Sequence, residues 1–375
     1  MTVHDASAAA RASVERDQIV PLQFLRGLAA SGVVVEHLLE RYARRGALPV
    51  GVPEFCAKLG QTGVATFFAI SGFIMVFIAL RNGRTTPSGP AFLRGRYLRI
   101  APLYYLTTVA IVAYGWVTHI ARPDPAYRLP TAAEWLFSAA FVPHRGVFGP
   151  IQPIYELGWT LHYEMFFYVL FAIGLSLWGR RGAFGVLGAL GFLIAVGPFV
   201  DAPPDAYGLR VAAYVFTRPI MGYFAIGIAI ALLRHRFLHR LPRLPVPIMA
   251  AILLLALLLA ALDYNRATTM AAIAVALAVT ILPCAAAGTG RFAAFSRAFG
   301  DASYSIYLTH TFLLGAFAAL TASAAMRGLP ALTAMALLAC LLCGIAGWLT
   351  WRWVELPIAR RIRGRRPSEV ELTAP

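Results

Sequence analysis

Apolar residues occur along this chain in long runs, separated by short segments that are rich in arginine. About ten of these runs are long enough, or nearly so, to cross a bilayer core about 30 Å thick as a helix. A lipid core offers the backbone no hydrogen-bond partners, so each run is expected to be helical. The pattern predicts an all-α, polytopic integral membrane protein with about ten transmembrane helices. The runs span, approximately, residues 22–40, 60–80, 100–120, 157–178, 184–200, 217–233, 245–262, 267–287, 303–322 and 331–353.

The composition and charge distribution agree with this pattern. Of the 375 residues, 59% are hydrophobic and only 13% are charged, which is unlike a soluble domain. The net charge is +16, but the arginines are dispersed between apolar runs, which argues against a nucleic-acid-binding surface. With the N-terminus inside, the cytoplasmic segments hold twice as many Lys and Arg residues as the outer segments. This bias follows the positive-inside rule, so both termini are expected in the cytoplasm.

The chain shows no linker or composition shift that would separate domains. We predict a cytoplasmic N-terminal tail at 1–19, a single transmembrane domain at 20–360 and a basic cytoplasmic C-terminal tail at 361–375. The first residues lack the apolar core of a cleavable signal, so the first span is expected to be an uncleaved anchor. Cys340 and Cys343 lie one helical turn apart without further zinc ligands nearby in the sequence, so packing and no metal site are expected.

Ionisable residues occur within the first apolar run. Such residues are costly in lipid and usually face a cavity or a partner. Arg26 and His37 are eleven residues apart, so they share one helix face about 16 Å apart along its axis. Glu40 lies one turn beyond His37, where it can hydrogen-bond the imidazole. A lone histidine near a helix end is often only interfacial, but one oriented by a carboxylate suits a general base.

Small residues form a stripe on the second run. Gly60, Gly63, Phe67 and Ser71 follow one another at spacings of three and four, which places them on one helix face. Small side chains allow a close approach by another helix or by a thin ligand chain. Both interpretations stay open from the sequence.

Three arginines, Arg94, Arg96 and Arg99, crowd the start of the third run in "FLRGRYLRIAPLYYL". Membrane orientation alone accounts for some arginine at this position. Three within six residues is denser than orientation requires, and guanidinium groups bind phosphates well. The cluster predicts a site for the phosphates of lipid headgroups or of a nucleotide.

Two later runs also carry polar stripes. Thr160, Glu164 and Tyr168 follow at four-residue spacing in the fourth run, with Glu164 expected at a depth comparable to that of His37. A buried carboxylate needs a cation, a hydroxyl or a substrate as its partner. Tyr307 and His310 share a face of the ninth run, where His310 is as compatible with simple packing as with a site.

These stretches resemble, in order and from about residue 20 to 360, the membrane-bound acyltransferase-3 family. The similar features are the Arg26–His37 spacing, "GVATFFAISGF", "FLRGRYLRIAPLYY", "WTLHYEMFFY", "SYSIYLTH" and the closing "VELP". The resemblance implies a membrane enzyme that transfers an acyl group from cytoplasmic acyl-CoA, usually acetyl-CoA, to a hydroxyl of a carbohydrate. It implies no permanently bound cofactor, and a location in the inner membrane among lipids, a lipid-linked glycan acceptor and proteins of glycan assembly.

The candidate site residues combine these arguments with the resemblance. The candidate catalytic residues are His37, Arg26, Glu164 and Glu40. The candidate acyl-CoA-binding residues are Arg94, Arg96, Arg99, Ser71, Phe68, Gly63 and Tyr104. The candidate acceptor-binding or supporting residues are Trp159, Tyr168, Tyr307 and His310.

A transporter or flippase of a lipid-linked saccharide is the alternative from another class. It would also use many helices with intramembrane His and Glu residues. Paired half-helices broken by Gly or Pro in two related halves would favour it. The sequence shows no such pairing.

Overall fold

The structure is a computed structural model that describes most of the chain in separate segments. The chain divides into two compact units, Met1–Leu80 with Ile226–Pro375, and Arg81–Ala225. Each unit is described by itself. The described residues are 19–46, 48, 52–80, 87–123, 125, 127–146, 150–203, 208–236, 245–262, 265–281, 290–325 and 328–363.

The described residues confirm the all-α prediction. They contain helices at all ten apolar runs, and their only β pairing is an isolated antiparallel bridge between Arg145 and Ile151. The predicted tails at 1–19 and 361–375 lie almost wholly outside the described residues. Their boundaries, and that of the single domain at 20–360, stay predictions.

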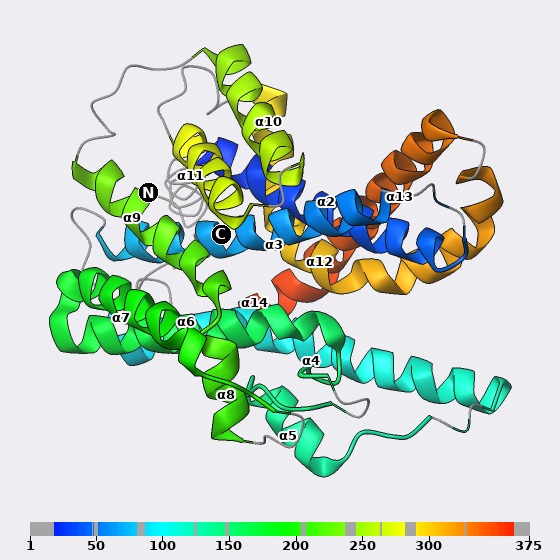
Figure 1. The fold of residues 1–375 in the computed structure, drawn as a ribbon, viewed down its shortest axis with the longest axis horizontal. Coiled ribbons are helices and arrows are strands. Elements are labelled where there is room, and N and C mark those ends of the chain that lie inside the picture. The colour runs from blue at the N-terminus through cyan, green and yellow to red at the C-terminus, as the bar shows by residue number, and fades with distance from the viewer. Residues whose placement is uncertain are drawn as a thin grey trace, which may run out of the picture. The chain divides into compact units, whose positions relative to one another are not determined.

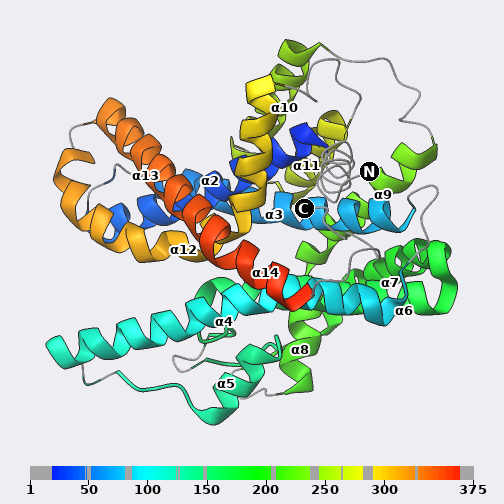
Figure 2. The same ribbon diagram turned by 180° about the vertical axis from the view of Figure 1, so that it is seen from behind.

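The first unit combines the helices before Leu80 with those after Ile226 (Figure 1). Figure 2 shows its last three elements continuing as one long helical segment. Its elements are α2 (Val20–Ala43), α3 (Val52–Ala79), most of α9 (Gly222–Arg236), α10 (Val246–Leu262), α11 (Arg266–Ile281), α12 (Gly290–Ala325), α13 (Leu329–Thr350), a π-helical turn (Trp351–Glu355) and α14 (Leu356–Arg363).

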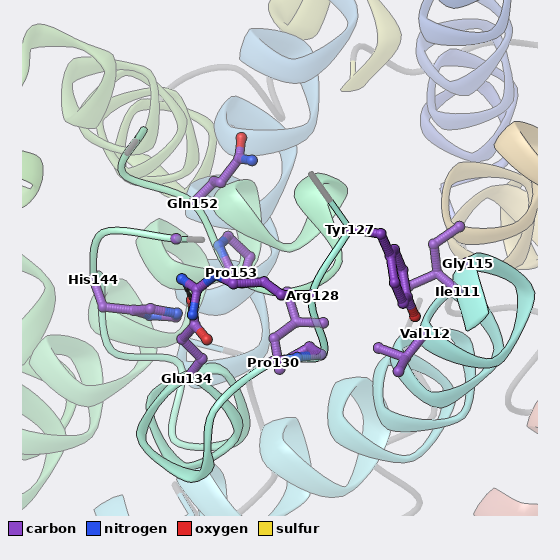
Figure 3. Close-up of a pocket in the computed structure, with 12 residues that line it drawn as sticks. Ile111, Val112, Gly115, Tyr127, Arg128, Pro130, Glu134, His144, Gln152 and Pro153 are labelled. Carbon is purple, nitrogen blue, oxygen red and sulfur yellow. Dashed lines mark hydrogen bonds and ion pairs between the residues drawn. The ribbon is translucent and has the colours of Figure 1, made fainter. Parts of the chain in front are cut away.

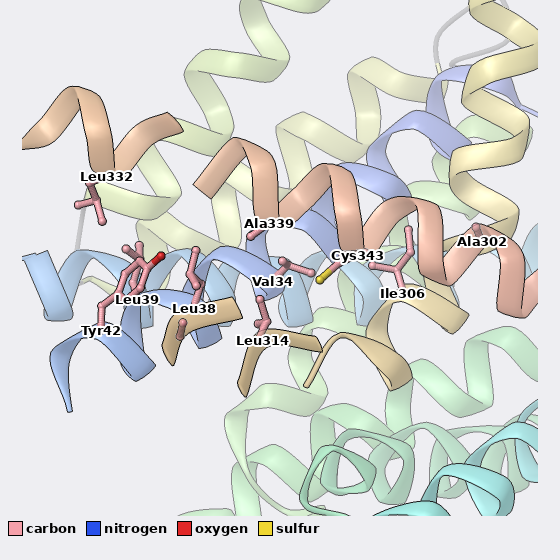
Figure 4. Packing of buried hydrophobic residues seen from close by; sticks show 12 residues of the cluster. Val34, Leu38, Leu39, Tyr42, Ala302, Ile306, Leu314, Leu332, Ala339 and Cys343 are labelled. Atoms are coloured by element: carbon pink, nitrogen blue, oxygen red, sulfur yellow. The ribbon is translucent and has the colours of Figure 1, made fainter. Parts of the chain in front are cut away.

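A core of aliphatic side chains joins α2, α12 and α13 (Figure 4). Val34 and Leu38 of α2 meet Ile306 and Leu314 of α12, and Cys343 of α13 completes the cluster. All five side chains are at most 2% exposed. Burial of these side chains holds α2 between two C-terminal helices, which fixes the position of the ionisable residues on α2.

Glycines permit close helix crossings in the same unit. A Cβ at Gly63 of α3 would lie 2.6 Å from the carbonyl oxygen of Ala29 on α2. A Cβ at Gly347 of α13 would lie 2.7 Å from the Cα of Ile306 on α12. Both distances are shorter than real Cβ contacts, so only glycine fits, as in other membrane helix pairs.

The second unit is built on two long antiparallel helices. It contains α4 (Gly89–Ala121), α5 (Ala132–Ala139), a 3-10 turn (Glu156–Gly158), α6 (Trp159–Trp178), α7 (Gly182–Val196) and α8 (Leu209–Phe216). The antiparallel register follows from two contacts: Gly158 lies against Tyr104, and Tyr168 lies near Arg96. After α6 the chain turns at Gly179, whose φ is +53°. It then returns as α7, with Gly182 against Gly174.

The helices identify a multi-pass membrane protein. Among the described residues, six helices are long and apolar enough to cross a membrane, or up to seven if the bent pair Leu209–Phe216 and Pro219–Arg234 is one span. One of the six, Glu156–Phe199, is the stretch that turns back at Gly179. Two shorter apolar helices lie at Pro247–Ala260 and Arg266–Ile281. The count of ten spans and the cytoplasmic termini stay predictions.

Candidate active site

His37 near the C-terminal end of α2 is held by a carboxylate. Its Nδ1 lies 3.2 Å from Oε2 of Glu40, and the other oxygen of Glu40 accepts a hydrogen bond from Nη2 of Arg44 at 2.6 Å. The contact predicted between His37 and Glu40 is confirmed. When Nδ1 donates to the carboxylate, Nε2 carries the free lone pair. The arrangement therefore orients His37 with a basic nitrogen available for proton transfer.

A second histidine lies beside His37. The ring centroids of His37 and His310 are 5.2 Å apart, although the two residues come from α2 and α12. His310 is fully buried, and its Nδ1 lies 3.1 Å from the carbonyl oxygen of Ile306, to which it donates as the neutral tautomer. Its Nε2 is buried and has no hydrogen-bond partner among the described residues. Buried nitrogens of this kind are normally paired, so the position suits a ligand or a water molecule.

Aromatic and polar residues surround the histidine pair. The ring of Tyr307 is 6.2 Å from that of His310, and Phe67 of α3 meets Tyr307 edge-on at 6.3 Å. Ser305, on the same helix, donates a hydrogen bond of 2.6 Å to Oε2 of Glu355 in the π-helical turn. Glu355 belongs to the closing "VELP" stretch of the sequence. The structure adds a link from Glu355 to α12, two turns or less from His310 and Tyr307.

Arg26 is a buried cation on the same helix as His37. It is 6% exposed, and its Nη1 donates to Oε1 of Gln23 at 3.1 Å. Gln23 is fully buried, and its Nε2 has no partner among the described residues. Buried ionisable residues of membrane helices are rare and commonly functional. The role of Arg26 in catalysis stays a prediction.

The stripe on α3 is covered by α2 at two of its positions. Gly60 lies directly against the side chain of Glu36, and Gly63 lies against the backbone of Ala29. Helix packing therefore accounts for both glycines. Further along, Phe68 is 2% exposed and Ser71 is half-buried. Donor binding by Gly63, Phe68 and Ser71 stays a prediction.

The second unit brings three of the candidate residues together. Arg96 of α4 is 6% exposed and lies over the rings of Phe92 and Tyr168, at 5.7 and 6.0 Å from their centroids. The hydroxyl of Tyr168 donates to Glu164 one turn earlier on α6. The antiparallel register places Glu164 beside the arginine-bearing part of α4. The sequence did not predict this association of Glu164 with the basic cluster; its expected depth relative to His37 stays a prediction.

The other arginines of the cluster differ in exposure. Arg94 is exposed, whereas Arg99 is half-buried. Tyr104 is fully buried, and its ring lies 5.1 Å from that of Phe141, so packing accounts for it. Trp159 begins α6 and meets Tyr163 edge-on at 6.0 Å. Donor binding by Tyr104 and acceptor binding by Trp159 stay predictions.

The fold and this site define a multi-pass helical membrane protein with a carboxylate-oriented histidine in one unit and an arginine–tyrosine–glutamate cluster in the other. A family model described as an acyltransferase domain matches residues 20–351. The chain is also 34% identical over 267 residues to the exopolysaccharide production protein ExoZ of Rhizobium meliloti (strain 1021), a match that covers 69% of this chain and 78% of that relative. No solved structure gives a significant match. The chain belongs to the acyltransferase-3 family, and this confirms the resemblance seen in its sequence.

Proposed function

We propose that this acyltransferase moves an acyl group, with acetyl as the first to test, from cytoplasmic acyl-CoA to a hydroxyl of a carbohydrate acceptor, with His37 as the base. Family membership supports acyl transfer, and the name of the relative ExoZ links that protein to exopolysaccharide production. The observation that carries the choice of base is the hydrogen bond between His37 and Glu40. We place the enzyme in the inner membrane, where cytoplasmic acyl-CoA and envelope glycans are both within reach.

The chemical step needs one base and one returned proton. Nε2 of His37 removes the proton of the acceptor hydroxyl as its oxygen attacks the carbonyl carbon of the thioester. The tetrahedral intermediate then collapses, the carbon–sulfur bond breaks, and the imidazolium returns the proton to the leaving CoA thiolate. Glu40 stabilises the positive charge that His37 carries between these two events. The oxyanion that forms on the thioester requires a hydrogen-bond donor beside His37.

The donor is proposed to bind through its phosphates. Guanidinium groups form bidentate, charge-assisted hydrogen bonds with phosphate oxygens. Arg94 is exposed at the start of α4, close in sequence to Arg96 and Arg99. Arg96 lies over the ring of Tyr168, whose hydroxyl donates to Glu164, and we propose that Glu164 positions Arg96 through Tyr168.

The first experiment uses full-length protein in detergent with acetyl-CoA and exopolysaccharide from the host, stripped of its acyl groups by mild base. Thiol release and acetyl transfer are measured for the parent, for His37→Gln and for a control, Glu156→Gln, which alters an exposed carboxylate. Loss of general base catalysis predicts a fall of about 10² to 10⁴-fold in His37→Gln. Acetyl-CoA binding should persist, and Glu156→Gln should behave as the parent.

Two results would contradict the proposal. Full activity in His37→Gln would remove this residue as the base. A parent protein that neither binds acetyl-CoA nor releases thiol, but moves a lipid-linked saccharide across vesicles, would favour the transporter or flippase.

A further inference from the structure

A pocket lies in the second unit at the end of α4 that is distant from the arginine cluster. It has a volume of about 210 Å³ and is lined by residues of α4, of α5, of the segment between them and of the segment that follows α5. Sixteen residues separate Arg96 from Val112 in its wall, which is about 24 Å along a helix. The pocket therefore lies far from the proposed donor site on the same helix. Six of its lining residues carry the argument: Ile111, Val112, Tyr127, Arg128, Glu134 and His144 (Figure 3).

A fixed carboxylate forms one polar wall. Glu134 is 7% exposed, and its Oε2 accepts hydrogen bonds from the backbone nitrogen and Oγ1 of Thr131, at 2.7 and 2.9 Å. The nitrogen of Glu134 in turn donates to Oγ1 of Thr131 at 3.2 Å, which completes the capping box that begins α5. The other oxygen of Glu134 lies 3.5 Å from Nη2 of Arg128. The pair presents donors and acceptors with little net charge.

A buried histidine completes the polar lining. His144 is 7% exposed, and its Nδ1 lies 3.0 Å from the carbonyl oxygen of Val142. Its Nε2 is buried, without a hydrogen-bond partner in the part of the chain that is described. Figure 3 shows the ring directed toward Arg128 and Glu134. Such a nitrogen is expected to meet a ligand hydroxyl or a water molecule.

The backbone around His144 is held in an unusual conformation. Phe141 has a φ of +56°, although it is neither glycine nor asparagine. Bulky residues adopt this region rarely and at an energetic cost. The ring of Phe141 packs on Tyr104 and Tyr105, with centroids 5.1 and 6.1 Å away. This aromatic packing holds the turn that carries His144 into the pocket.

The wall segment around Gly146 is hydrogen-bonded to other parts of the second unit. The nitrogen of Gly146 donates to the oxygen of Pro150 at 2.8 Å, beside the bridge between Arg145 and Ile151. Nη2 of Arg145 donates to the carbonyl oxygens of Ala202 and Pro203, at 3.2 and 2.7 Å. The pocket is therefore built by hydrogen bonds from several segments.

An aromatic ring supplies an apolar side. Tyr127 stacks on His119 with ring centroids 4.7 Å apart, and its ring lies over Gly115. Ile111 and Val112 extend the apolar surface along α4. A ring with a polar tip beside fixed hydrogen-bonding groups is typical of sites for ligands with both apolar faces and hydroxyls.

We infer that this pocket binds a neutral sugar residue of the carbohydrate acceptor, an inference that rests on the proposed function. A sugar ring offers hydroxyls to Arg128, Glu134 and Nε2 of His144, and its C–H face to Tyr127. The paired charges of Arg128 and Glu134 favour a neutral sugar over a uronic acid or a phosphate. At about 210 Å³, the pocket is smaller than sites of about 300 Å³ or more for drug-sized ligands, which suits one sugar residue of a longer chain.

The test measures saccharide binding without catalysis. Full-length protein in detergent is titrated with tritiated oligosaccharides prepared from the deacylated exopolysaccharide, in the absence of acetyl-CoA. His144→Gln and Tyr127→Ala are compared with the parent and with Arg210→Gln, which alters an exposed arginine of the same unit. The expected result is a Kd raised about tenfold or more in both pocket variants and unchanged in Arg210→Gln. Tyr127→Ala keeps the test valid if His144→Gln does not fold.

A kinetic measurement separates this inference from the proposed function. The pocket variants should raise the KM for the saccharide and leave the KM for acetyl-CoA unchanged. A parent without thiol release would overturn the proposed function, while the binding titration would still decide on the pocket. Equal saccharide Kd values in the parent and both folded pocket variants would overturn the pocket, as would preferential binding of uronic-acid oligosaccharides.

Discussion

His37 and His310 lie with their ring centroids 5.2 Å apart, one on α2 and the other on α12. In each ring Nδ1 is engaged, by Glu40 in one case and by the carbonyl oxygen of Ile306 in the other. Both Nε2 atoms are therefore available as acceptors when the rings are neutral. Two adjacent neutral imidazoles can hold one hydroxyl group between them, an arrangement that suits a role of His310 in placing the acceptor.

Replacement of His310 should separate packing from function. His310→Phe retains a buried ring of similar shape and removes both nitrogens. If His310 places the acceptor, acetyl transfer should fall at least tenfold, whereas stability should fall by no more than the one lost hydrogen bond from Nδ1 to Ile306, about 1 kcal/mol. The measurement pairs acetyl transfer with thermal unfolding in detergent. Equal activity in His310→Phe and the parent would show that the residue only packs.

Replacement of Glu40 should lower turnover without affecting donor binding. Glu40→Gln removes the charge that stabilises protonated His37 in the transition state, so kcat should fall about tenfold or more. Arg44→Gln is the matched control, since its side chain is 68% exposed and exposed ion pairs contribute only about 0–1 kcal/mol. Steady-state kinetics with varied acetyl-CoA give both constants. A change in KM alone would argue against the orienting role of Glu40.

Local patterns predicted most of the helices and one side-chain contact. Apolar runs of near-membrane length locate the helices because lipid requires internal backbone hydrogen bonds. The contact between His37 and Glu40 follows from helical spacing. The neighbours of His37 and Arg96 could not be predicted in this way, because His310 and Tyr168 come from distant helices. These residues come together through helix crossings at glycines and through core packing, which the spacing of residues within one helix does not specify.

The sequence did not predict the pocket beside His144, for a related reason. The stretch between the third and fourth spans is proline-rich and has no helical periodicity. Its one local signal is the capping box of Thr131 and Glu134, which indicates a helix start rather than a site. The positive φ of Phe141 and the links from Arg145 to Ala202 and Pro203 bring the walls together. These features appear only in three dimensions.

Two glycines of α13 predict opposite responses to the same substitution. A Cβ at Gly347 would lie 2.7 Å from the Cα of Ile306, whereas a Cβ at Gly344 meets nothing within 4 Å. Gly347→Ala should therefore lower the free energy of unfolding by about 1–3 kcal/mol through overpacking. Gly344→Ala should be neutral or slightly stabilising, because alanine favours helix. Thermal unfolding of both variants in detergent checks this, and equal destabilisation would contradict the observed crossing of α12 and α13.

The arginines of the basic cluster should divide into a structural and a donor-binding role. Arg96 is buried over Phe92 and Tyr168, so Arg96→Gln should lower the unfolding temperature by removing cation–π contacts of about 2 kcal/mol in a desolvated site. Arg94 is exposed, and Arg94→Gln should leave stability unchanged but raise the KM for acetyl-CoA about tenfold, the effect of one lost phosphate contact. Because salt screens exposed charges, this KM difference should shrink as ionic strength rises. Calorimetric unfolding and steady-state kinetics at low and high salt provide the measurement. A KM for acetyl-CoA that is the same in Arg94→Gln and the parent at low salt would remove Arg94 from the donor site.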